Sequence, residues 1–150
     1  MNQTGSHAVT IGADSAVDTE GLKAFCAGLP GVEARRLDAP ANILVYAIGG
    51  KTFAYFKTSE PERWRFSFKA SPEHFLELTD IPGIRPARWL GRHRWVTVVD
   101  VRSLPGAYLG ELVDWSYRHA LGTLSRTRQV ALTGVPVPPR TRGGRVRGRG

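Results

Sequence analysis

The sequence predicts an α+β domain in which an antiparallel β-sheet packs against N-terminal and C-terminal helices, with a further short helix between strands. Two observations carry this prediction. Apolar residues recur at helical spacing near the N-terminus and again after residue 103. Between these segments, strand-like runs follow one another without helical crossovers, which favours an α+β sandwich over a doubly wound sheet. The length of 150 residues suits one domain with a substantial core.

The first predicted helix begins at residue 18 or 19 and ends at Pro30-Gly31. Asp18 or Thr19 can cap it, because either side chain can accept a hydrogen bond from an otherwise unpaired backbone N–H. Apolar residues then fall at i, i+3, i+4 and i+7 on one face: Leu22, Phe25, Cys26 and Leu29. The position of Cys26 within this face predicts a buried apolar side chain rather than a reactive thiol.

Three strands are predicted next. Residues 42–48 (NILVYAI) and 51–57 (KTFAYFK) form a hairpin, because Gly49 and Gly50 between them can supply the positive φ angles of a two-residue turn. The third strand, residues 63–69, alternates strictly: Trp64, Phe66 and Phe68 share one face, and Arg63, Arg65, Ser67 and Lys69 share the other. This alternation is typical of an antiparallel sheet with one packed and one wet face.

A short helix, a loop, a strand and a long helix complete the prediction. Ser71 is a suitable cap and Pro72 a suitable first residue for the short helix, which ends at Pro82-Gly83. Residues 83–94 are predicted as a loop or short wing and residues 94–101 as a strand. The longest helix begins at Ser103 and ends near residue 124.

The two ends of the chain are predicted to lie outside the folded domain, which spans residues 18–125. Residues 1–17 are small, polar and aperiodic, and residues 126–150 are predicted as a disordered Arg/Gly/Pro-rich tail. The net charge of +8 is concentrated in that tail, which holds seven arginines and no acidic residue. The other 125 residues carry 14 basic against 13 acidic side chains, so the domain itself is close to neutral.

Several classes of protein are disfavoured by the composition. No apolar run approaches the roughly 18 residues of a membrane span, and no secretory signal precedes the domain. Cys26 is the only cysteine, and the four histidines show no ligand spacing on one element. We therefore expect a cytoplasmic protein with no metal, no cofactor and no membrane partner.

The stretch GIRPARWLGRHRWVTVV (83–99) holds the candidate nucleic-acid-binding residues of the domain. Its arginines would contact phosphates and its first tryptophan would offer a stacking or wedge surface. The candidates in this stretch are Arg85, Arg88, Trp89, Arg92, His93 and Arg94. Alternatively, the Trp89 side chain is buried in the core, and the arginines are solvated or paired with acidic residues of the short helix.

Two further sets of cations are candidates. Arg63, Arg65 and Lys69 share one face of a strand, and they would merge with the first set if that strand lay near residues 94–100; otherwise they form an ordinary wet face. The tail would add sequence-independent affinity by releasing counterions from nucleic acid. Its candidate contacts are Arg140, Arg142, Arg145, Arg147 and Arg149. A bias of composition towards arginine is the alternative explanation of the tail.

Five segments resemble successive landmarks of the MmcQ/YjbR-like family: FCAGLPGVE (25–33), AIGGKTFAYF (47–56), FKASPE (68–73), GIRPARWLGRHRWVTV (83–98) and LGELVDWSYRHAL (109–121). The resemblance covers residues 19–125 approximately. It implies a frataxin-like or double-wing fold, in which an antiparallel sheet packs against helices. It also implies the function usually given to the family, DNA binding, which rests on analogy of fold.

We therefore expect a non-enzymatic DNA-binding protein whose basic tail adds non-specific affinity. The alternatives are a small protein-interaction or ligand-sensing module and, third, an enzyme. No catalytic constellation supports the third: Ser116 and His119 lie on one predicted helix, but its periodicity turns Ser116 inward and His119 roughly opposite.

Overall fold

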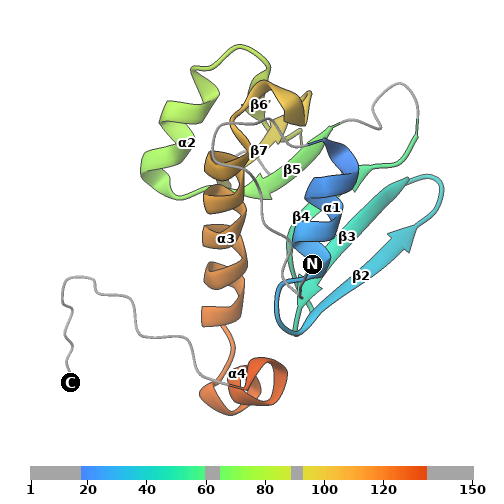
Figure 1. Ribbon diagram of the computed structural model, residues 1–150, viewed down its shortest axis with the longest axis vertical. Helices are drawn as coiled ribbons and strands as arrows, with labels where there is room; N and C mark the ends of the chain where they lie inside the picture. The colour runs from blue at the N-terminus through green and yellow to red at the C-terminus, as the bar shows by residue number, and fades with distance from the viewer. Residues whose placement is uncertain (1–17, 60–64, 89–92, 135–150) are drawn as a thin grey trace, which may run out of the picture.

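Six antiparallel strands form one sheet in the order β2-β3-β4-β5-β7-β6 (Figure 1). This computed structural model describes residues 18–59, 65–88 and 93–134. The strands are β2 (Val32–Leu37), β3 (Ile43–Ile48), β4 (Lys51–Lys57), β5 (Phe66–Lys69), β6 (Ile84–Pro86) and β7 (Trp95–Val98). The α+β prediction is confirmed.

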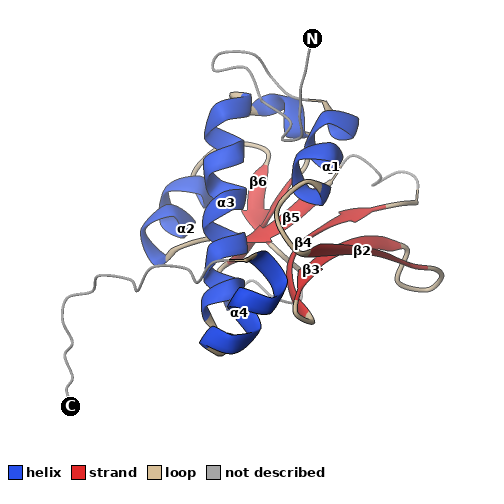
Figure 2. Ribbon diagram, turned by 60° about the horizontal axis from the view of Figure 1, so that its bottom comes forward, coloured by secondary structure: helices blue, strands red, loops and turns tan. Residues whose placement is uncertain are grey.

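The helices form a layer against one face of this sheet (Figure 2). They are α1 (Thr19–Ala27), α2 (Pro72–Thr79), α3 (Gly106–Gly122) and α4 (Arg126–Thr133), with a short 3₁₀ turn, η2 (Val101–Ser103), before α3. α1 and α3 contact each other; α3 packs on the central strands β3, β4 and β5, α1 contacts the edge strand β2, and α2 packs on β6 and β7. None of the helices in the described ranges is both long enough and apolar enough to cross a bilayer.

The core lies between the two layers, and the strand register explains its composition. Phe66 of β5 is paired with Phe56 of β4 and with Val98 of β7, so these three side chains lie in one row on the helix side of the sheet. All three are 0 % exposed. Leu22 of α1 and Leu109 of α3 are buried in the same cluster. Burial of each such side chain contributes about 1.5–3 kcal/mol.

Local signals placed the starts of α1 and α2 correctly. The Asp18 carboxylate accepts a hydrogen bond from the Gly21 N–H at 2.7 Å, which caps α1. Ser71 accepts a hydrogen bond from the His74 N–H at 3.2 Å, and Pro72 occupies the first turn of α2. α3 begins at Gly106 rather than at Ser103, because residues 101–103 form η2, whose first turn is capped by Asp100.

The β3–β4 hairpin is confirmed, with φ angles of 57° at Gly49 and 84° at Gly50. The register shifts after Tyr46, so that Phe53 becomes an additional residue on β4. Phe53 is 1 % exposed and its ring meets the Tyr117 ring of α3 at 5.5 Å. The bulge therefore directs a further aromatic side chain into the core.

Two strands were not predicted. β2 lies at one edge of the sheet with residues 33–37 exposed on both of its faces, so its sequence lacks the alternation that marks a half-buried strand. β6 forms the opposite edge within the segment predicted as a loop or wing. It ends at Pro86, and an edge strand tolerates proline because one side of its backbone needs no N–H donor.

The prediction of a disordered tail from residue 126 was wrong for residues 126–133, which form α4. Ser125 caps this helix by accepting a hydrogen bond from the Arg128 N–H, and Gly134 ends it with φ of 88°. Gln129 is 6 % exposed, and Leu132 packs against the core. The arginines of this segment lie on the exposed side of α4. Because of their charge, the sequence was interpreted as a tail and not as an amphipathic helix.

Candidate nucleic-acid interface

The candidate interface is the face of the sheet opposite the helices, which we call the outer face. The register aligns one residue of every strand across it: Arg35, Val45, Tyr55, Ser67, Thr97 and Arg85. Residues directly opposite each other in antiparallel strands share a face, so this row lies on one surface. Lys57, Arg65, Lys69 and Trp95 share the same alternation and also lie on the outer face.

The outer face is rich in cations. Arg35 and Arg85 are exposed at the two ends of the row, on the two edge strands. Lys57, Arg65 and Lys69 lie between them on the central strands and are half-buried. Among the described strand residues of this face, Glu33 is the acidic one. Cations therefore outnumber acidic side chains among these described residues, which gives the outer face a positive charge.

Two stacked aromatic rings lie among these cations. The Tyr55 and Trp95 rings have centroids 5.8 Å apart and planes inclined by 27°. They come from β4 and β7, so the rings meet across β5. On the same face the Ser67 and Thr97 hydroxyls share a hydrogen bond of 2.7 Å, and Ser67 is 3 % exposed. Tyr55 and Trp95 therefore form a stacked aromatic pair that is surrounded by cations.

The two domain sets of predicted cations meet at one corner of the outer face. Lys69 donates a hydrogen bond from Nζ to the His93 carbonyl at 2.6 Å, and the Ala70 N–H donates to the Arg94 carbonyl at 2.8 Å. Burial, and then the nearby charge of Arg94, lower the pKa of Lys69. The pairing of β5 with β7 thus joins the strand at 65–69 to the segment at 93–95.

The predicted site residues fall into three groups. Arg85, Arg65 and Lys69 belong to the outer face as defined above. Arg88 is exposed just beyond β6, and His93 and Arg94 are exposed just before β7. The other candidates lie outside the described residues: Arg63, Trp89, Arg92, Arg140, Arg142, Arg145, Arg147 and Arg149.

Four of the cationic and aromatic residues of the outer face were not among the predicted candidates. Arg35 lies on β2, for which no strand was predicted, and Lys57, Tyr55 and Trp95 lie on strands that were predicted correctly. Lys57 also donates a hydrogen bond from Nζ to the Ala41 carbonyl at 2.9 Å. The alternation within each strand could have indicated these positions, but only the strand order brings them together.

Two serines that could act as nucleophiles, Ser116 and Ser71, are occupied by structural contacts. Ser116 is 1 % exposed and donates its hydroxyl to the Phe53 carbonyl. Ser71 Oγ lies 3.0 Å from His74 Nδ1, and His74 Nε2 lies 4.0 Å from Glu77, but Ser71 is 7 % exposed and caps α2. This arrangement holds the start of a helix and presents no accessible nucleophile.

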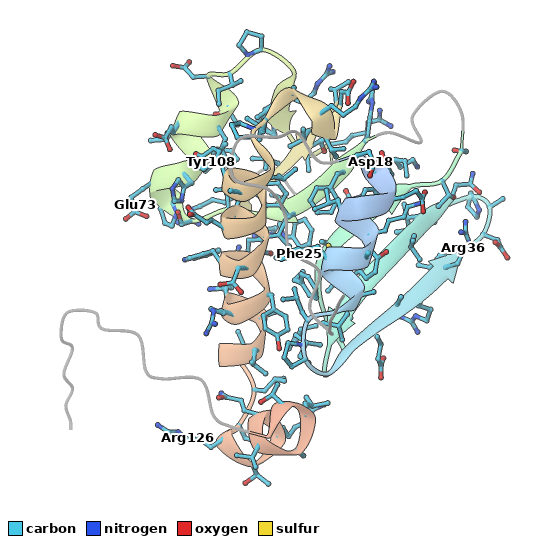
Figure 3. The ribbon with its side chains drawn as sticks, viewed as in Figure 1. Asp18, Phe25, Arg36, Glu73, Tyr108 and Arg126 are labelled. Atoms are coloured by element: carbon cyan, nitrogen blue, oxygen red, sulfur yellow. The ribbon has the colours of Figure 1, made fainter. Side chains whose placement is uncertain are left out.

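The contact between α2 and α3 uses the same group of side chains. Tyr108 lies on the side of α3 that faces α2 (Figure 3), and its hydroxyl donates to Glu77 at 3.3 Å. Burial, followed by the charge of Glu77, raises the pKa of Tyr108. Burial likewise raises the pKa of the Cys26 thiol. Within the part of the chain that the structure describes, no three His, Cys, Asp or Glu side chains gather in a possible metal site.

The fold defines a class of small α+β proteins in which one helical layer covers one face of an open antiparallel sheet. Within that class, the chain belongs to the YjbR family, whose model matches residues 27–119. The resemblance read from the sequence motifs is therefore confirmed. No curated protein matches the chain.

The fold is similar to that of solved structures, among them the following two. A Deinococcus radiodurans protein, DR2400, described by its domain DUF419, is 24% identical with a TM-score of 0.67, covering 90% of this chain and 97% of that one. A protein from Pseudomonas syringae, a structural genomics target, is 16% identical with a TM-score of 0.56, covering 69% of this chain and 99% of that one. These likenesses concern the architecture alone.

Proposed function

We propose that the protein is a non-enzymatic DNA-binding protein that contacts the phosphate backbone through its outer face. The observation that carries the proposal is the gathering of cations on one face of the sheet, with Arg35 and Arg85 at the two ends of one cross-strand row and Lys69 beside that row on β5. Strands spaced about 4.8 Å apart make this row about 24 Å long, comparable to seven base pairs of duplex. Cations at this spacing can engage several phosphates at once.

The stacked aromatic pair of Tyr55 and Trp95 supports a binding role for the same surface. Tyr55 is half-buried beside Trp95, so it presents part of its ring among the cations. A ring held by stacking loses little conformational entropy when it contacts a sugar or a base. Tyr55 would supply apolar contact, while the cations supply most of the affinity.

The tail arginines would add affinity that does not depend on sequence. Each arginine placed near a phosphate releases condensed counterions, and this gain weakens as the salt concentration rises. In this proposal the outer face sets the position of the domain on the duplex. The tail only increases the time that the protein remains bound.

The test measures duplex binding as a function of salt in a full-length chain whose five tail arginines are replaced by glutamine. We expect this variant to bind, with a slope of log affinity against log salt that reports contacts of the domain. Arg85→Gln and Lys69→Gln should each lower the slope by about 0.9 for every phosphate that the replaced cation neutralised.

A matched control is Arg118→Gln. Arg118 is exposed on α3, in the helical layer, and is paired with Asp114 at 2.8 Å. Its replacement should leave the slope unchanged. If the tail-neutralised chain does not bind duplex, or if Arg118→Gln lowers the slope as much as Arg85→Gln, the outer face is not the DNA-binding surface.

A further inference from the structure

Among the residues that the structure describes, no strand pairs with the outer edge of β2, which leaves this edge open to pairing. β2 is the outermost strand of the sheet on the side away from α2 (Figure 1), and Figure 3 shows the labelled Arg36 at this edge. Residues 33–37 are exposed on both faces, and Leu37 is 37 % exposed. An edge of this kind presents backbone donors and acceptors that can template another strand.

The alternation of hydrogen-bonded and non-hydrogen-bonded residue pairs identifies which backbone groups of β2 point away from β3. The Thr58 N–H donates to the Asn42 carbonyl at 2.9 Å, so even-numbered residues of β3 bond to β4. The odd-numbered residues of β3 therefore bond to β2, where Val45 is paired with Arg35. It follows that Ala34 and Arg36 direct their N–H and C=O groups away from β3.

Val32 is the third even-numbered residue of β2, and one of its two backbone groups, the N–H, already makes a hydrogen bond. Its N–H donates to the Leu29 carbonyl at 3.2 Å in the turn after α1. Only the Val32 carbonyl is available to an added strand. The open edge thus offers two complete backbone pairs, at Ala34 and Arg36, and one additional acceptor.

The sequence of β2 is complementary to itself in one antiparallel register. A two-fold axis perpendicular to the sheet places residues of the same face opposite each other. With Ala34 opposite Ala34 of a second copy, Glu33 of each copy lies opposite Arg35 of the other on the outer face. These are the close, non-hydrogen-bonded pairs, in which side chains interact most strongly.

The neighbouring registers are disfavoured by the same charges. Moving the axis to Arg35 places two arginines opposite each other, and moving it to Glu33 places two glutamates opposite each other. Like charges in directly opposite positions are destabilising. In the favoured register, the two Ala34 residues exchange two backbone hydrogen bonds, and each Arg36 N–H reaches the Val32 carbonyl of the other copy.

We propose that β2 pairs antiparallel with β2 of a second copy of this chain, with Ala34 at the two-fold axis and Glu33 opposite Arg35. The six-stranded sheets then continue into one another, and both outer faces lie on the same side. A contact of one strand per copy is at the small end of interface sizes, below about 1,200 Å². The dimer is therefore reversible, with a dissociation constant in the micromolar range.

The test is sedimentation velocity of the full-length chain, without nucleic acid, from micromolar to several hundred micromolar protein. Wild type should change from monomer to dimer over this range. Glu33→Arg and Arg35→Glu, which create like-charge pairs, should each weaken the dimer at least tenfold. The double variant E33R/R35E restores opposite charges and should return to within about threefold of wild type. A protein that stays monomeric, or a double variant no better than the single ones, overturns the proposal.

Cysteine cross-linking tests the register itself. At the axis, paired Cα atoms lie about 5.5 Å apart, within reach of a disulfide. Ala34→Cys should therefore form a covalent dimer on mild oxidation, while the native Cys26 is buried. Leu37→Cys is the control, because two residues three positions from the axis lie about 20 Å apart. Equal cross-linking of the two variants would exclude this register.

Discussion

Ser116 and Phe53, 63 residues apart in the sequence, are joined by a hydrogen bond of 2.7 Å from the Ser116 hydroxyl to the Phe53 carbonyl. The same hydroxyl accepts the Lys69 N–H at 3.2 Å. One buried side chain of α3 therefore satisfies backbone groups of two neighbouring strands. It does so next to the β4 bulge, where the strand ladder leaves such groups without their usual partners.

Replacing this serine should destabilise the fold. Ser116→Ala leaves the buried Phe53 carbonyl and the partly buried Lys69 N–H without their partner, at a cost of about 1–3 kcal/mol. Urea unfolding followed by circular dichroism measures the loss. Ser103→Ala is the control, because its hydroxyl bonds the Asp100 carbonyl at an exposed site and should cost less. Equal losses in the two variants would contradict the bridging role.

The two hairpin glycines should differ in their tolerance of alanine. Both have positive φ, which costs an alanine about 1–2 kcal/mol. A Cβ at Gly49 would also lie 2.6 Å from Leu124 Cδ1, whereas a Cβ at Gly50 meets open space. Gly49→Ala should therefore lose about 1–3 kcal/mol more than Gly50→Ala. Thermal unfolding of both variants measures the two losses of stability. Equal losses would contradict the predicted clash between a Cβ at residue 49 and Leu124.

Stability should fall in alkaline solution because of Tyr46. Burial first, and then electrostatic interaction with Cys26 and with Glu20, raise the pKa of Tyr46 above its ordinary value. The fold therefore favours the neutral phenol, and this contribution is complete below pH about 10 and is lost as the pH rises beyond it. Tyr46→Phe should show a shallower decline of the urea midpoint between pH 9 and 11. A decline as steep as that of wild type would assign the effect to other groups.

Tyr55 should matter for duplex binding more than for folding. In the proposed DNA complex its ring supplies apolar contact beside the cations, so Tyr55→Ala should weaken duplex binding several-fold. It should leave the slope against salt unchanged, because every cation that faces a phosphate is still present. Leu76→Ala, at a 73 % exposed position on α2, is the matched loss of an exposed apolar side chain. Weakening by both variants alike would remove Tyr55 from the interface.

The sequence predicted those parts of the fold that local chemistry determines. The caps Asp18 and Ser71, the Gly49-Gly50 turn and the alternation around Phe66 all act within a few residues. β2 lacked such a signal, since an exposed edge strand shows no alternation. Ser125 and Gly134 did mark the two ends of α4, but the arginines between them led to a prediction of disorder.

The candidate site was predictable only in pieces. Lys69 and Arg85 were identified as cations of a wet face and a loop. Their membership of one surface depends on the pairing of β5 with β7, whose residues Ser67 and Thr97 are 30 positions apart. Arg35 joins them only through the full strand order. Such non-local pairing is set by the packing of the whole core, which no single motif encodes.

The proline that ends β6 has a consequence for assembly. β6 has three residues and stops at Pro86, which has no N–H to offer a neighbouring strand. A sheet that gains strands through β2 therefore terminates at β6 in each copy. In the proposed dimer, association of this chain would stop at two molecules, because the opposite border of the same sheet does not offer the strand pairing that could propagate into a fibre.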